Sequence, residues 1–187
     1  MARRNDKRTR LVEAADQLFH QQGVSNTTLA NIAALAEVPL GNVYYYFKSK
    51  DSIILAVIDR RKRSVQSLFS QWNESDNVKT RLQAFINHAL TLAEEAAQFG
   101  DSLGSLCQEL GKQGGNIGEA ASGLMQDVLN WCETQFIALG RPEPDAKKLA
   151  LNLVASLQGI SLITLTFRDP SFINRQNEFL NQWLETV

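Results

Sequence analysis

Three consecutive tyrosines and the lysines that follow them are the side chains in this sequence best suited to contact a polyanion. The chain has three tyrosines, and they lie together at Tyr44, Tyr45 and Tyr46. Successive side chains on a helix point about 100° apart, so the three rings cannot all be buried and at least one hydroxyl must meet solvent or phosphate. Lys48 and Lys50 add positive charge directly afterwards. Hydroxyl and ammonium groups are the usual partners of phosphate oxygens in protein–DNA complexes.

Two short helices are needed to position this run. Apolar residues recur at helical spacing over 29–36, and the hydroxyl of Thr27 or Thr28 can cap the helix that begins there. Pro39 ends one helix and can sit in the first turn of the next, which predicts a further helix over 40–47. Two short helices joined by a tight turn, the second rich in groups that can touch phosphate and bases, are the physical form of a helix-turn-helix.

Within the second of these helices, Val43 and Phe47 lie one turn apart and are predicted to pack inward. Leu40, Gly41 and Asn42, together with the tyrosines, are then left to divide among the DNA groove, the DNA backbone and the helix interface. The alternative interpretation is that the tyrosines divide between core and protein surface while the lysines form a solvated face.

Charge is distributed unevenly along the chain. Up to Arg63 there are 11 Lys or Arg residues against 6 Asp or Glu, a net of +5. From Ser64 onward there are 8 against 14, a net of −6. The basic end is where a polyanion would bind. A charged tail, either solvated or in contact with the DNA minor groove or backbone, is formed by Arg3, Arg4, Lys7, Arg8 and Arg10.

Composition excludes several classes of protein. The chain has 187 residues, of which 44% are hydrophobic and 21% charged, as in a globular protein with a real core. Its two cysteines and two histidines are too few and too far apart for a disulfide framework or a metal cluster. No catalytic Ser-His-Asp or Cys-His pair, phosphate loop or dinucleotide fingerprint can be assembled. The N-terminus lacks the apolar segment of a secretory signal. We expect a cytoplasmic protein that is not an enzyme and holds no metal or cofactor.

Helical periodicity extends along the whole chain and predicts an all-α fold of about nine helices. The first helix is predicted to end at Gly23, and a long fourth helix capped by Ser49 crosses the boundary between the basic and acidic parts. An N-terminal helix-turn-helix domain over 1–50 is thereby linked to a helical bundle over 51–187. Further helices are predicted over 78–99, 103–110, 116–139, 145–167 and 171–185.

The stretch 149–167 is apolar enough to raise the question of a transmembrane helix. Polar residues interrupt it at Asn152, Ser156, Gln158 and Ser161, and it lacks basic residues at both flanks. We interpret it as a buried or dimer-facing helix and expect no membrane span.

At this point the residues resemble the N-terminal domain of the TetR family of transcriptional regulators. The family signature is an Ile-Ala pair, a turn, and a Gly-x-Val-Tyr-x-Tyr-Phe-Lys-x-Lys run. In this chain the signature reads Ile32-Ala33 and Gly41-Asn42-Val43-Tyr44-Tyr45-Tyr46-Phe47-Lys48-Ser49-Lys50. The resemblance covers about 7–58. It implies an all-α homodimer whose larger C-terminal domain binds an effector and whose last two helices form a four-helix dimer interface.

The resemblance also implies which residues contact bases. Leu40, Gly41 and Asn42 lie where family members touch bases, and the amide of Asn42 has the best hydrogen-bonding chemistry for adenine. Two residues depart from the family pattern. Leu40 replaces a small polar residue, which favours apolar contact with a thymine methyl group. Glu37 occupies a turn position that is usually Gly, which indicates a slightly different turn.

Other residues fall at phosphate-contacting positions of the family, among them Tyr44, Tyr46 and Lys50. Thr28, at the N-terminus of the first helix of the pair, can offer its hydroxyl and amide to a further phosphate. Tyr45 can contact either a base or a phosphate. The predicted DNA-binding residues are therefore Thr28, Leu40, Gly41, Asn42, Tyr44, Tyr45, Tyr46, Lys48 and Lys50.

Large apolar residues of the C-terminal region are candidate lining of an effector pocket, although most apolar residues at such spacing are simply core. The candidates are Phe99, Leu103, Leu106, Cys107, Met125, Trp131 and Phe136. The segment 104–110 resembles a TetR subgroup that includes drug-responsive repressors, some of which carry Cys-Pro where this chain has Asp101-Ser102. We expect a small-molecule effector of apolar or aromatic character. Cys107 can also be either a redox-active thiolate or an inert buried thiol.

These inferences lead to one main expectation with two alternatives. We expect a repressor that binds a palindromic double-stranded DNA operator as a homodimer, through its last two helices, and that a small-molecule effector releases. One alternative is a ligand-independent DNA-binding or architectural protein. The other is a thiol-based redox-sensing regulator that uses Cys107.

Overall fold

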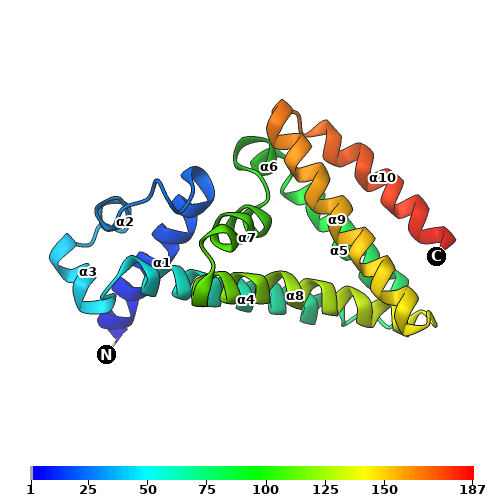
Figure 1. The fold of residues 1–187 in the computed structure, drawn as a ribbon, viewed down its shortest axis with the longest axis horizontal. Coiled ribbons are helices and arrows are strands. Elements are labelled where there is room, and N and C mark those ends of the chain that lie inside the picture. The colour runs from blue at the N-terminus through cyan, green and yellow to red at the C-terminus, as the bar shows by residue number, and fades with distance from the viewer. Residues whose placement is uncertain (1) are drawn as a thin grey trace. The chain divides into compact units, whose positions relative to one another are not determined.

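The computed structural model describes residues 2–187, with side chains from Asp6 onward, so Arg3 and Arg4 lie outside the described side chains. The described residues form ten helices and no strand (Figure 1). The helices are α1 (Ala2–Gln22), α2 (Leu29–Leu35), α3 (Leu40–Tyr46), α4 (Lys50–Trp72), α5 (Val78–Thr91), α6 (Ala93–Phe99), α7 (Ser102–Gln113), α8 (Gly115–Ala138), α9 (Glu143–Phe167) and α10 (Ser171–Thr186). The all-α prediction is confirmed.

The chain forms two compact units. The first contains the residues up to Arg63 together with Ser105–Leu124, and the second contains Ser64–Gly104 and Met125–Val187. Helices α4, α7 and α8 each contribute residues to both units. The predicted boundary at residue 50 is a statement about which part of the chain binds DNA, and it stays a prediction.

The first unit is built on α1, which ends where the sequence predicts. Gly23 has a φ of 84°, the left-handed conformation that glycine adopts without a steric penalty, and its amide bonds to the carbonyl of Phe19. Helix α1 packs against α2, and α2 packs against α3. Burying each of the larger side chains contributes about 1.5–3 kcal/mol. Buried apolar residues of this unit include Leu11, Phe19, Ile32, Val43, Phe47, Ile53, Val57, Leu106 and Leu110.

Ion pairs fix α4 to α1 in the same unit. The Nε of Arg61, a buried side chain, lies 2.6 Å from Asp16, and the Nε of Arg60 lies 3.3 Å from the same carboxylate. Arg60 also contacts Glu13 at 3.2 Å. A buried guanidinium is tolerated only when a charged partner compensates for its lost hydration. These contacts therefore orient α4, which follows directly after the helix-turn-helix.

The second unit is a helical bundle in which α10 packs against α5 and α9, while α9 packs against α6. Its main core combines residues from α5, α8, α9 and α10, with side chains from α4 packed against them. The fully buried members include Leu82, Ile86, Cys132, Phe136, Leu153 and Leu184.

The predicted helix over 78–99 is two helices, separated at Leu92. Neither Gly nor Pro marks the break. Leu92 instead adopts φ −111° and ψ 5°, and the hydroxyl of Thr91 donates to the carbonyl of His88. After the break, Ala93 and Ala96 of α6 form a small apolar cluster with Ile173. The break thus coincides with packing of α6 against α9 and α10, a tertiary contact that periodicity does not encode.

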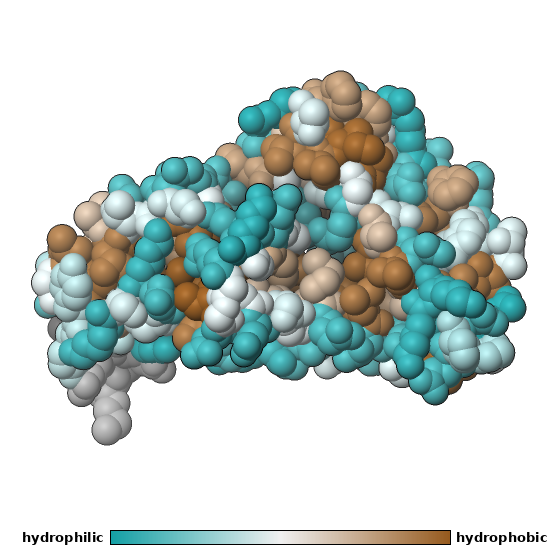
Figure 2. Space-filling view, in the orientation of Figure 1, coloured by the Kyte–Doolittle hydropathy of each residue, from teal (hydrophilic) through white to brown (hydrophobic). Residues whose placement is uncertain are grey.

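Helix α9 carries apolar side chains on its outer face. Figure 2 shows apolar surface gathered where α9 ends and α10 begins, and Leu162 and Phe167 are 60% and 66% exposed. Among the described residues, α9 is the one helix long and apolar enough to cross a membrane, although a single such helix is weak evidence for a span. Only 28% of its most apolar window is buried within the protomer.

Candidate DNA interface

The N-terminus of α2 is fixed by a reciprocal cap. The amide of Asn31 donates to the Thr28 hydroxyl at 3.1 Å, and the Thr28 amide donates to the Asn31 side chain at 2.9 Å. This is a capping box with Asn in place of Glu or Gln. The hydroxyl and amide of Thr28, both predicted to contact phosphate, thus have partners inside the protein. Sequence reasoning missed Asn31, although its spacing of three from Thr28 is the signal for such a cap.

The turn between α2 and α3 is held in an unusual conformation. Glu37 has a φ of 51°, a left-handed conformation that costs a residue with a Cβ about 1–2 kcal/mol. The family-pattern departure at this position therefore coincides with a strained turn. Arg10 of α1 pairs with the Glu37 carboxylate at 3.1 Å, and the amide of buried Val38 donates to the carbonyl of Ala33 at 2.9 Å.

Helix α3 buries one face and exposes the other. Val43 and Phe47 are buried, as predicted. On the opposite side, Leu40, Tyr44 and Tyr45 are 43%, 51% and 57% exposed. Gly41 and Asn42 are also exposed, and nothing lies within 4 Å of the position that a Cβ on Gly41 would occupy. The three predicted base-contacting residues are therefore all exposed, and the surface at Gly41 is open.

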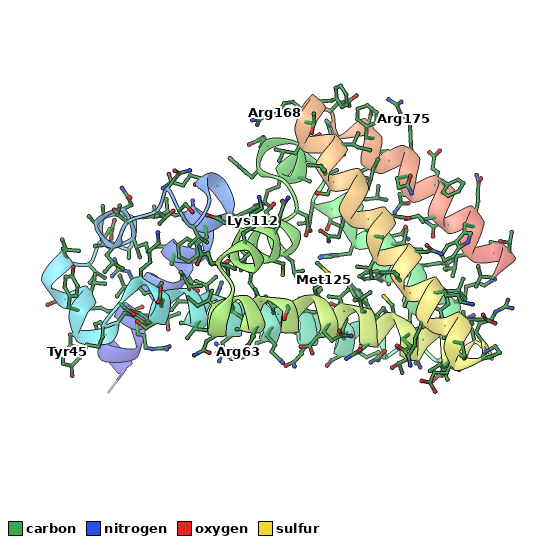
Figure 3. All side chains as sticks on the ribbon, viewed as in Figure 1. Tyr45, Arg63, Lys112, Met125, Arg168 and Arg175 are labelled. Atoms are coloured by element: carbon green, nitrogen blue, oxygen red, sulfur yellow. The ribbon has the colours of Figure 1, made fainter. Side chains whose placement is uncertain are left out.

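The three tyrosines have different surroundings. Tyr44 and Tyr45 are exposed, and Figure 3 shows Tyr45 on the outer side of α3. Tyr46 is half-buried and meets the ring of Tyr45 edge-on, with 5.1 Å between ring centroids. An edge-to-face pair of this kind restricts both rings. Tyr46 therefore supports Tyr45 as well as carrying a hydroxyl of its own.

The two lysines also differ. Lys48 is exposed, whereas Lys50 is half-buried and its ammonium donates to the carbonyl of Val24 in the loop after α1. Lys50 therefore links the start of α4 to the segment that precedes α2. Arg8 of α1 lies over the ring of Phe47 at 5.2 Å, a cation–π contact at the end of α3.

Part of the predicted basic charge is neutralised locally. Arg10, Arg60 and Arg61 pair with carboxylates of the first unit, and Arg63 pairs with Asp59 at 3.0 Å. The carboxylates in these pairs are already counted in the net of +5, so the pairs leave the net charge unchanged and instead fix the positions of these arginines.

One side chain of the first unit, which the sequence suggests as a ligand contact or a helix-surface carboxylate, has partners that sequence reasoning did not predict. Glu109 of α7 accepts hydrogen bonds from the loop that joins α1 and α2, although α7 is more than 80 residues further along the chain. No local pattern signals such a contact, because it depends on the tertiary fold.

The candidate pocket residues divide between the two units. In the second unit, Trp131 and Phe136 are buried in the core, Leu103 and Met125 pack against it, and Phe99 is half-buried at the end of α6. In the first unit, Leu106 is buried, and the half-buried Cys107 thiol donates to the carbonyl of Ala121 at 3.2 Å. Their role in binding an effector stays a prediction.

An aromatic cluster surrounds Trp131 in the second unit. Phe69 stacks on Trp131 with 4.8 Å between ring centroids, and Trp72 and Phe85 contact the same indole at 5.5 and 5.7 Å. His88 meets Trp72 edge-on at 5.6 Å. Burial lowers the pKa of His88, and the charge of Asp101 opposes that shift only in part. Of these residues, sequence reasoning proposed only Trp131 for the pocket.

Together, the capped α2, the turn at Glu37 and the exposed face of α3 define a helix-turn-helix DNA-binding protein. Residues 11–57 match the family described as "Bacterial regulatory proteins, tetR family". This match indicates that residues 11–57 form a DNA-binding domain of the TetR type.

Similarity to curated relatives covers only part of the chain. The chain is 41% identical over 54 residues to the HTH-type transcriptional regulator TtgR of Pseudomonas putida, which covers 29% of this chain and 26% of that protein. It is 28% identical over 88 residues to the HTH-type transcriptional repressor NemR of Escherichia coli, covering 46% and 44%. The aligned part thus spans about a quarter to a half of the length of these relatives.

The fold similarity extends over the whole chain. The structure of a TetR transcriptional regulator from Chloroflexus aurantiacus matches with a TM-score of 0.86 at 22% identity, covering 99% of this chain and 97% of that one. At this level of identity the match shows a shared fold. It includes the C-terminal helices, where the sequence carries no comparable motif.

Proposed function

We propose that the protein is a transcriptional repressor that binds a palindromic operator as a homodimer and is released by a small-molecule effector. The observation that carries the proposal is the exposed face of α3, where Leu40, Gly41 and Asn42 lie open beside Tyr44 and Tyr45. A helix presented in this way fits the major groove, where each base pair offers a distinct pattern of donors and acceptors.

The side chains of this face have different roles in the proposal. The Asn42 amide reads an adenine edge, and Leu40 contacts a thymine methyl group. Tyr44, Tyr45 and Lys48 contact phosphates and fix the register, which adds affinity without sequence information. Lys50 contributes mainly through its contact with Val24, because its ammonium already has a partner within the protein.

Homodimerisation is proposed through α9 and α10. Leu162 and Phe167 on α9 and Phe179 on α10 are 60–66% exposed, and Leu151 and Ile163 extend the apolar surface of α9. Apolar side chains gathered in this way mark interaction sites in soluble proteins. A twofold dimer places two copies of α3 on a palindrome whose half-sites are about one helical turn, or a multiple of it, apart.

The effector is proposed to be apolar or aromatic and to bind the C-terminal region. The aromatic cluster around Trp131 supports this chemistry, because aromatic rings contact one another favourably in stacked or edge-on geometry and an aromatic effector offers such a ring. In this proposal the protein binds DNA and effector without catalysing a reaction, and it works in the cytoplasm, where its operator lies.

Selection of bound duplexes from random DNA with the full chain tests this proposal. We expect enrichment of a palindrome, with binding that weakens steeply as salt rises because phosphate contacts release counterions. Repeating the selection with compounds that raise the melting temperature tests effector release. Enrichment of no sequence would contradict the operator proposal, and an operator complex that no stabilising compound weakens would favour a ligand-independent DNA-binding protein.

A further inference from the structure

The carboxylate of Glu109 occupies a site formed by the loop after α1. It accepts the amide of Val24 at 2.7 Å, and both the amide and the hydroxyl of Ser25 at 2.6 Å. Two successive amides aimed at one anion form a nest, and hydrogen bonds to a charged acceptor are roughly twice as strong as neutral ones. Three short contacts from one loop therefore fix Glu109 and the loop to each other.

The loop has the local structure that such a nest needs. Gly23 reverses the chain with a φ of 84°, and a Cβ at this position would lie 3.1 Å from the Glu109 carboxylate. The hydroxyl of Thr27, which is buried, donates to the carbonyl of Gly23 at 2.8 Å and closes the loop immediately before Thr28. The nest and the N-terminus of α2 therefore belong to one short hydrogen-bonded loop, so a shift of the nest is expected to move the start of α2.

The other end of the helix-turn-helix meets the same loop. Lys50, the first residue of α4, donates to the carbonyl of Val24. Val24, whose amide donates to Glu109, thus also accepts a hydrogen bond from the first residue of α4. The segments before α2 and after α3 are therefore joined at Val24. Glu109 of α7 binds the same loop through the amides of Val24 and Ser25.

The Glu109 carboxylate remains ionised in this site. Partial burial raises its pKa, but hydrogen bonds from Ser25 and Val24, together with the charge of Lys50, outweigh burial and leave the pKa below its usual value. The contact is therefore a charged one at neutral pH.

Helix α7 is itself held at its other end in the second unit. Asp101 accepts the amide of Gly104 at 2.6 Å and the side-chain amide of Gln158 at 3.2 Å. A Cβ on Gly104 would lie 1.8 Å from the Gln158 oxygen, so this approach requires glycine. One helix therefore carries an α9 contact at its start and the Glu109 contact two turns later.

We propose that Glu109 is a positioning residue for operator binding, which holds both ends of the helix-turn-helix through the Val24–Ser25 nest and transmits the position of α7 to α3. This inference rests on the proposed function. The proposal assigns Glu109 no contact with DNA or effector.

The test compares Glu109→Gln with Glu119→Gln, the same change at an exposed glutamate of α8 in the same unit. The neutral amide retains the size of the side chain but removes the charge and one acceptor. Operator affinity of Glu109→Gln is expected to fall about tenfold, because charged hydrogen bonds are lost and fewer molecules hold the binding-competent arrangement. The salt dependence should be unchanged, since no phosphate contact is removed. Glu119→Gln should bind as the wild type does.

Hydrogen exchange provides the second readout on the same proteins. The amides of Val24 and Ser25 are expected to exchange faster in Glu109→Gln, while those in the middle of α1 keep wild-type protection. Ser25→Ala removes one of the three contacts and should give a smaller change in the same direction. Wild-type operator affinity in Glu109→Gln, measured well below its melting temperature, would overturn the inference. Absence of any operator for the wild type would contradict the proposed function instead.

Discussion

The exposed tyrosines of α3 act at the residue scale through single hydroxyl groups. Tyr44 and Tyr45 are exposed, while Tyr46 is half-buried against Tyr45. Three consecutive helical side chains point in different directions, so the three tyrosine rings were expected to differ in burial, and they do. Their order of exposure gives an order of expected effects on DNA binding.

Replacing Tyr44 with Phe removes one exposed hydroxyl and retains the ring. We expect affinity to fall several-fold for operator and random duplexes alike, because a phosphate hydrogen bond carries no sequence information. Tyr46→Phe should have the smaller effect. Fluorescence anisotropy with both duplexes measures the two losses. A larger loss for Tyr46→Phe would contradict the assignment of Tyr44 to the DNA-facing side.

A pH effect is expected from His88. Burial lowers its pKa below the usual 6.5, so the unfolded chain takes up the proton at higher pH than the folded chain does. The stability from neutral His88 is fully present above the unfolded pKa of about 6.5 and is lost as the pH falls from there through the lower pKa of the folded state. Urea unfolding at about pH 7.5 and pH 5.5 should therefore show a smaller loss for His88→Gln than for the wild type. Equal losses would contradict the inferred burial effect.

At the scale of elements, local signals account for some helices and tertiary contacts for others. Gly23 marks the end of α1, while Thr28 and Pro39 mark the starts of α2 and α3. These boundaries could be predicted because each residue acts within a few residues of its own position. The break at Leu92 could not, since no Gly or Pro marks it and α6 meets α9 and α10 only in the tertiary fold. The same holds for Glu109, whose partners are distant in the sequence.

The turn between α2 and α3 offers a test of backbone strain. At Glu37 the φ of 51° penalises any residue with a Cβ, so Glu37→Gly should be more stable than Glu37→Ala by about 1 kcal/mol. Both variants lose the ion pair with Arg10, which leaves the backbone as the difference between them. Urea unfolding measures it.

Ala34→Gly is the matched control, because Ala34 is exposed within α2. Within a helix the order is reversed, so the Ala34→Gly variant should be less stable than the wild type by about 1 kcal/mol. The same order at both positions would contradict a strained turn at Glu37.

At the scale of the whole molecule, a single copy of the chain leaves apolar side chains on the outer face of α9 exposed to solvent. Its apolar character was visible in the sequence, but exposure could be assigned only from the fold, because a buried helix would have the same composition. A second copy of the chain is the proposed partner for this face.

Leu162→Arg tests that partner. A charge placed on an exposed position of α9 should convert the dimer to a monomer, because it would be buried without a counter-charge at the interface. Leu55→Arg, at an exposed leucine of the first unit, should leave the dimer intact. Sedimentation velocity at about 10 μM distinguishes the two states. A dimeric Leu162→Arg would place the interface elsewhere.

Base reading by α3 is the central claim, and the affinity of Asn42→Ala for a selected operator duplex tests it most directly. Asn130→Ala, an exposed helical asparagine of the second unit, is the matched control. We predict that Asn42→Ala loses at least about tenfold in operator affinity, as expected for a lost bidentate contact, while its affinity for random duplex is unchanged. Asn130→Ala should match the wild type on both. An Asn42→Ala variant that still discriminates operator from random DNA as the wild type does would contradict the claim.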